Sequence, residues 1–97
     1  GCVLQAGDAL WAAGYSGNAN LGINSTAGAN NLFQRVLGQS GVIEDWNCYG
    51  QGTSAWGVGV LYDDGRVDAC GENNSYGETG TQAGNLHDVA TLTNVIF

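Results

Sequence analysis

Short runs of alternating large and small residues, separated by glycine and asparagine, dominate the chain. In the clearest run, 55–62, the large residues Trp56, Val58, Val60 and Tyr62 alternate with Ala55, Gly57 and Gly59. In an extended strand this alternation gives one packing face and one face that a neighbouring backbone can approach closely. Helical periodicity is nearly absent, and glycine recurs every few residues. The sequence therefore predicts an all-β fold.

A tight turn follows this run. Asp64-Gly65 is a dipeptide that tolerates the positive φ of a hairpin turn, and residues 66–70 alternate again. We therefore predict a β-hairpin in which Asp64 and Gly65 are structural turn residues, and in which Gly57 and Gly59 lie on the face of close approach.

The returning strand of this hairpin has a second copy earlier in the chain. The aligned segments are 10–14 with 67–71 at an offset of 57, and Val36 with Val89 and 42–43 with 95–96 at an offset of 53. Small-residue loops follow both copies of the strand. A period of roughly 53–58 residues, built of short strands and Gly/Asn turns, is typical of a β-propeller with four-stranded blades. A duplicated pair of hairpins in a small sandwich is the alternative.

Three stretches carry a family resemblance: LYDDGRVDACGENNSYGETG at 61–80, LWAAGYSGNANLG at 10–22 and VIEDWNC at 42–48. Together they resemble the blade repeat of the regulator of chromosome condensation family. The resemblance implies a partial β-propeller of roughly two four-stranded blades that is open at both ends. One repeat copy would occupy about 3–52 and the second about 60–97.

The number of blades bears on how this region is completed. A closed propeller takes 4–8 blades, whereas the 97 residues hold fewer than two repeats and begin and end inside a blade. Open blade edges invite pairing with another chain. We expect residues 1–97 to form a single repeat region that is completed either by a homo-oligomeric ring or by the remainder of a longer repeat chain.

The charge balance narrows the classes of partner. Nine acidic residues stand against two basic ones, Arg35 and Arg66, which gives a net charge of −7. Such a chain is repelled by phosphate backbones and anionic lipid headgroups, so we expect neither a nucleic-acid partner nor a membrane partner. The acidic, lysine-free, Gly/Asn-rich composition favours an extracellular or virion-surface setting.

The cysteines form an odd set. Cys2, Cys48 and Cys70 contain no C-x-x-C pair, so neither a full disulfide framework nor a thiolate zinc cage is available. We expect buried thiols that act as small hydrophobes, with Cys48 and Cys70 as structural residues. One disulfide with a spare thiol is the alternative.

Few residues of the types used in catalysis occur in a suitable pattern. Ser16 and Ser54 miss the G-x-S-x-G pattern, and His87 is the only histidine. Asp63-Asp64 offers two carboxylates for a calcium ion, but a hairpin tip explains both residues without a metal. We therefore expect a protein that is not an enzyme and that uses no cofactor and no metal.

Aromatic residues are the better functional candidates. We expect Trp11, Trp46 and Trp56 to fill the space between blades as structural residues. Two tyrosines and two asparagines lie in corresponding repeat loops, where aromatic side chains can anchor a protein or glycan partner: Tyr15, Asn18, Asn73 and Tyr76.

These observations favour a non-enzymatic propeller-repeat interaction or structural module. A receptor-binding or surface component of a larger assembly, such as a phage tail, fits the composition. The alternative is a sugar-binding lectin assembled from repeated blades. A second alternative, nucleotide exchange on a small GTPase, is implied only by the family resemblance.

Overall fold

Seven strands form two antiparallel sheets in the computed structural model of the chain. The structure describes residues 2–15, 21–24, 30–51, 55–71, 79–81 and 89–97, with the backbone alone at 50–51 and 55–56. The predicted all-β class is confirmed, and no helix occurs among these residues.

The first sheet has the strand order β1-β2-β3. Its strands are β1 (Cys2–Ala6), β2 (Ala9–Ala13) and β3 (Gln34–Arg35). Gly7 adopts a positive φ of 63° in the two-residue turn between β1 and β2, a conformation that glycine reaches without steric penalty. Leu4 pairs with Trp11, and Trp11 pairs in turn with Arg35.

The second sheet has the strand order β4-β5-β6-β7. Its strands are β4 (Ile43–Gln51), β5 (Ala55–Tyr62), β6 (Val67–Gly71) and β7 (Val89–Asn94). The predicted hairpin is confirmed as β5 and β6, with Asp64 and Gly65 in the turn. Gly65 has a φ of 89°, which explains why a glycine is needed there.

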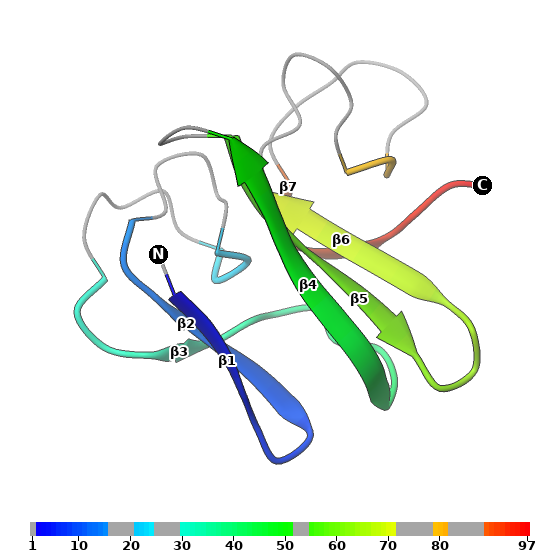
Figure 1. Cartoon of the computed structure of the whole chain (residues 1–97), viewed down its shortest axis with the longest axis horizontal. Helices are drawn as coiled ribbons and strands as arrows, with labels where there is room; N and C mark the ends of the chain where they lie inside the picture. The colour runs from blue at the N-terminus through cyan, green and yellow to red at the C-terminus, as the bar shows by residue number, and fades with distance from the viewer. Residues whose placement is uncertain (1, 16–20, 25–29, 52–54, 72–78, 82–88) are drawn as a thin grey trace.

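The two sheets pack against each other and enclose one core. Figure 1 shows them side by side, with both hairpin turns, β1–β2 and β5–β6, at the lower end of the view. Eleven buried residues form the core cluster: Leu10, Ala12, Leu21, Ile23, Val36, Val58, Val60, Tyr62, Cys70, Val89 and Leu92. The core therefore lies between the sheets and takes side chains from both.

The predicted alternation along β5 holds where side chains are described. Val58, Val60 and Tyr62 are at most 1% exposed and face the first sheet. The side chain of Trp56 lies outside the described part of the chain.

The prediction of a face of close approach is right for one glycine of β5 and wrong for the other. A Cβ added at Gly57 would collide with the ring of Tyr49 and with the carbonyl oxygen of Cys70. A Cβ added at Gly59 would meet no described atom within 4 Å. The difference arises because the partner of Gly57 on β4 is a tyrosine that leans across it, whereas the partner of Gly59 is Asn47.

Two backbone hydrogen bonds beside the first sheet have equivalents beside the second sheet. The amide of Val36 donates to the carbonyl of Leu10, and the amide of Val95 donates to that of Val67, each at 2.9 Å. The amide of Leu37 donates to Gly22, and that of Ile96 to Gly80, each at 2.8 Å. The position equivalent to Val36 is therefore Val95, so the alignments of Val36 with Val89 and of 42–43 with 95–96 are wrong.

Strand pairing extends this correspondence to the hairpins. Leu4 lies opposite Trp11, and Val60 lies opposite Asp68. Since Trp11 corresponds to Asp68, Leu4 corresponds to Val60, an offset that is one residue smaller than on the returning strand. The cause is the turn: three residues lie between the paired Tyr62 and Arg66, whereas two lie between the paired Ala6 and Ala9. The strands β1, β2 and β3 thus occupy the places of β5, β6 and β7.

The segment 36–42 crosses from the first sheet to the second and is bonded to both. Besides the bond from Val36 to Leu10, the amide of Leu92 donates to the carbonyl of Leu37 at 2.8 Å. At the far end, the amide of Asp63 donates to the carbonyl of Val42 at 2.9 Å.

A polar network holds the middle of this segment against β5 and β6. The Tyr62 hydroxyl donates to a carboxylate oxygen of Asp68 at 2.6 Å, and the Ser40 hydroxyl donates to the same oxygen at 3.1 Å. The guanidinium of Arg66 donates to the Ser40 carbonyl at 2.6 Å and stacks over the Tyr62 ring at 5.1 Å. Asp68 is only 3% exposed, and the hydroxyl donors Tyr62 and Ser40 compensate for the burial of its carboxylate.

Candidate functional site

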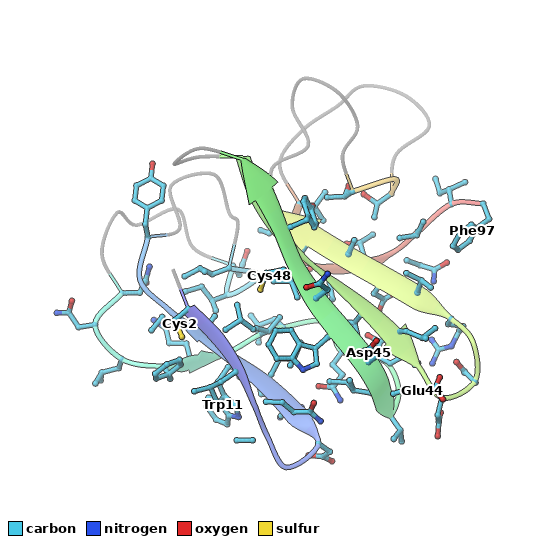
Figure 2. All side chains as sticks on the ribbon, in the orientation of Figure 1. Cys2, Trp11, Glu44, Asp45, Cys48 and Phe97 are labelled. Carbon is cyan, nitrogen blue, oxygen red and sulfur yellow. The ribbon has the colours of Figure 1, made fainter. Side chains whose placement is uncertain are left out.

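The outer face of the first sheet is apolar and uncovered in the described structure. Leu10 and Ala12 point into the core, so the alternating position Trp11 points outward, together with its cross-strand partners Leu4 and Arg35. Leu4 is 37% exposed. In Figure 2, Trp11 lies on the side of the first sheet away from β4.

This face repeats positions that are buried in the second sheet. By the correspondence of the two sheets, Cys2, Leu4 and Phe33 match Val58, Val60 and Leu92. Val58 and Val60 are 1% exposed, and Leu92 is 5% exposed, whereas Phe33 is 45% exposed. Residues that form the packing face of the second sheet therefore have exposed apolar counterparts on the first.

The outer face of the second sheet carries an open hollow of about 230 Å³. Its lining residues are Asp45, Trp46, Asn47, Gly59, Val60, Leu61 and Val67. Gly59 lies in the middle of this set on β5, between Asn47 of β4 and Ala69 of β6. The space that a side chain would fill at Gly59 is therefore part of the hollow.

The hollow is apolar at its floor and acidic at one edge. Leu61 and Val67 pair across β5 and β6, and Asp45 lies opposite Leu61 on β4. One carboxylate oxygen of Asp45 accepts a hydrogen bond from the amide of Trp46 at 2.8 Å. Figure 2 shows Asp45 on the side of β4 away from the first sheet. Such a surface suits an apolar side chain with a positive charge beside it.

Of the four predicted binding residues, the structure describes one. Tyr15 is 45% exposed, and it follows Gly14, whose amide and carbonyl both hydrogen-bond to the backbone of Asn30 at 2.9 and 3.0 Å. Asn18, Asn73 and Tyr76 lie outside the described residues. Tyr15 is therefore an exposed aromatic residue next to a firmly held backbone position.

The two described tryptophans have different places. Trp46 is partly buried against the core, and its indole nitrogen donates to the side-chain oxygen of Gln5 at 3.1 Å, which joins β4 to β1. Trp46 thus lies where the two sheets meet. Trp11 does not lie between the two sheets, because its strand neighbours Leu10 and Ala12 take the inward positions.

The three thiols are free and differ in burial. Cys70 is buried, Cys48 is half-buried and Cys2 is exposed, so the expectation of small buried hydrophobes holds for Cys70 and is wrong for Cys2. The alternative of one disulfide is also wrong. Burial raises the pKa of Cys70 to about 12, and burial followed by the nearby Cys2 raises the pKa of Cys48.

The turn residue Asp64 has a local partner. Its carboxylate accepts a hydrogen bond from the Arg66 amide at 3.1 Å and forms an ion pair with the Arg66 guanidinium at 2.7 Å. These bonds lower the pKa of Asp64 below its ordinary value. Both side chains are about half exposed, so the ion pair serves the turn and adds little to stability.

The residues of the outer face were not found from the sequence. Leu4 and Arg35 lie on short strands and Phe33 directly precedes β3, and none of them belongs to a motif. The sequence feature that could have identified them is their correspondence with Val60, Leu92 and Asn94. That correspondence depends on the lengths of the two hairpin turns.

In the described part of the chain, no group of three or more His, Cys, Asp or Glu side chains is arranged to hold a metal ion. Nor does this part contain a helix of the length and hydropathy that crossing a membrane requires.

Comparison of the chain with protein-family models, with curated proteins and with solved structures finds no match.

Proposed function

We propose that the chain is a non-enzymatic β-repeat interaction and structural module, a partial β-propeller that docks onto another protein through the outer face of its first sheet. The observation that supports this most directly is the exposure of Leu4 and Phe33, whose counterparts Val60 and Leu92 are buried. An apolar sheet face of this kind is stable when a second protein surface covers it.

The setting of the module is a larger surface assembly such as a phage tail or another receptor-binding structure. The net charge of −7 keeps the isolated module soluble, and it directs the module away from nucleic acid and anionic lipid. Arg35, on the docking face, is one of the two basic residues in the chain. Arg35 therefore gives the docking face a positive charge that can meet an acidic surface.

Cys2 reports whether this face is covered. It lies on the outer face and is exposed, whereas Cys70 is buried. We expect a thiol-alkylating reagent to modify Cys2 quickly in the dilute purified chain, and to modify it at least tenfold more slowly in the intact source assembly, because the docked partner excludes the reagent. Mass spectrometry of the alkylated peptides measures both rates.

A matched control uses a thiol outside the face. In a Val42→Cys variant, the new thiol sits at a position that is 59% exposed on the crossing segment, and it should react at similar rates in both states. Equal reactivity of Cys2 in the free chain and in the assembly would refute the proposed docking face.

A second candidate function, sugar binding, is favoured only by Tyr15. Tyr15 is 45% exposed and follows Gly14, whose backbone is hydrogen-bonded to that of Asn30. An exposed aromatic ring on a firmly held backbone is a suitable surface for stacking a sugar ring. If this function is correct, a glycan array will show saturable binding that Tyr15→Ala reduces at least tenfold while unfolding stability is unchanged. An array without saturable signal rules it out.

A further inference from the structure

The two outer faces of the molecule complement each other. One face, the ridge, carries the exposed residues Leu4 and Phe33 and the half-buried Trp11, with Arg35 beside them. The other carries the hollow over Gly59, with Leu61 and Val67 at its floor and Asp45 at its edge. Bulk on one face thus stands against open space on the other.

The contact between the two sheets shows how such faces pack. The first sheet and the segments beside it contribute Leu10, Gly22 and Val36, all buried, to the contact with the second. The counterparts of these three residues in the second sheet and beside it are Val67, Gly80 and Val95, and they are exposed or half-exposed. The second sheet therefore presents outward the same positions that the first sheet uses inward.

Gly22 and Gly80 make this equivalence visible at atomic level. A Cβ at Gly22 would lie 3.0 Å from a methyl group of Val36 and 2.7 Å from the sulfur of Cys70, which belongs to the opposite sheet. A Cβ at Gly80 would lie 3.4 Å from a methyl group of Val95, the counterpart of Val36, and near no other described atom. Among the described residues, none takes at Gly80 the place that Cys70 takes at the inner contact.

We infer that the occupant of the ridge is a second copy of this chain, an inference that rests on the proposed docking function. The copies are stacked head to tail, so that the ridge of one copy covers the hollow face of the next. Leu4 and Phe33 of one copy take the roles that Val60 and Leu92 have within the chain. Ala13, the counterpart of Cys70, comes to Gly80 of the neighbouring copy. The interface is heterologous, since it joins two different faces.

Sedimentation velocity of the chain over a concentration series tests this inference. We expect the wild type to associate reversibly. Leu4→Glu on the ridge and Gly59→Lys in the hollow should each weaken association by about tenfold or more. The first would bury a charge on an apolar face, and the second would fill the hollow that the neighbouring copy has to enter. A Cβ at Gly59 meets no described atom, and the new lysine lies beside Asp45, so this variant is expected to fold. Leu32→Glu, at a position that is 78% exposed and outside both faces, is the matched control.

Mixing the two variants is the decisive experiment. The Leu4→Glu chain keeps an intact hollow, and the Gly59→Lys chain keeps an intact ridge, so an equimolar mixture should form a one-to-one dimer that does not grow further. If Leu4→Glu fails to fold, Phe33→Glu replaces it on the same face. A mixture that stays monomeric, with each variant folded, overturns the head-to-tail arrangement.

Other outcomes also decide between the proposals. A wild-type chain that stays monomeric at its highest soluble concentration overturns self-stacking, and so does association that survives both charge variants. Neither result touches the docking function if Cys2 remains protected in the source assembly. If Cys2 is unprotected in that assembly, the docking function itself fails.

Discussion

Replacing Gly57 with alanine is expected to destabilise the fold by about 3 kcal/mol or more, or to prevent folding. The new Cβ would collide with the Tyr49 ring and with the main-chain carbonyl of Cys70. The ring can turn away only by giving up the hydrogen bond that its hydroxyl donates to that carbonyl at 3.1 Å. The carbonyl belongs to β6, the neighbouring strand in the middle of the sheet, and cannot move without disturbing the pairing of β5 with β6. Urea unfolding measures the change.

Gly59→Ala is the matched control, because Gly59 lies two residues along the same strand on the same face. Its Cβ meets no described atom, and alanine restricts the unfolded chain, so the variant should be unchanged or more stable by about 0.5–1 kcal/mol. Equal effects of the two substitutions would contradict the distinction drawn between the glycines.

The stability of the chain is expected to fall steeply in alkaline solution because of Cys70. Burial raises the pKa of this thiol from its ordinary value of 9.0 to about 12. Between these values the folded chain holds a proton that the unfolded chain has lost, so the free energy of unfolding decreases as the pH rises. A shift of this size corresponds to roughly 4 kcal/mol over the interval. Urea unfolding at a series of pH values measures the slope.

The contribution of Cys70 is isolated by comparison with Cys70→Ala. The variant is less stable below pH 9 because a buried side chain is shortened, but its decline above pH 9 should be much shallower. The pKa of Tyr62 is also raised, chiefly by burial and then by its bond to Asp68, so some decline remains in both proteins. Parallel pH profiles would show that the Cys70 thiol titrates alike in the folded and unfolded chains.

The hairpin of β5 and β6 could be predicted because its determinants are local. Val58, Val60 and Tyr62 alternate with small residues, and Asp64-Gly65 suits a positive φ at the turn. Nothing outside residues 55–71 is needed to place these strands, and the structure agrees with the prediction over the described residues.

The correspondence between the sheets was harder to predict, because loops of different length lie between the matching strands. Sequence similarity aligned Val36 with Val89, whereas the hydrogen bonds to Leu10 and Val67 match Val36 with Val95. A register of this kind depends on which carbonyl each amide meets, and valines six residues apart look alike to a sequence comparison.

Surfaces were the least predictable part of the molecule. Trp11 looks like a core residue by its type, but its direction is set by Leu10 and Ala12, whose side chains take the inward positions. Gly57 and Gly59 are the same residue on the same face, and only the cross-strand neighbours Tyr49 and Asn47 make one crowded and the other open. For the two glycines, a partner on the neighbouring strand decides the outcome.

The crossing segment 36–42 has a consequence for how the molecule comes apart. Its amides and carbonyls bond to β2, to β7 and to the residue that follows β5, and Arg66 and Asp68 hold Ser40 from β6 and its turn. Opening either sheet therefore breaks bonds that the other sheet also needs. The two sheets form one cooperative unit, and a mechanical load applied to one is shared at once by the other.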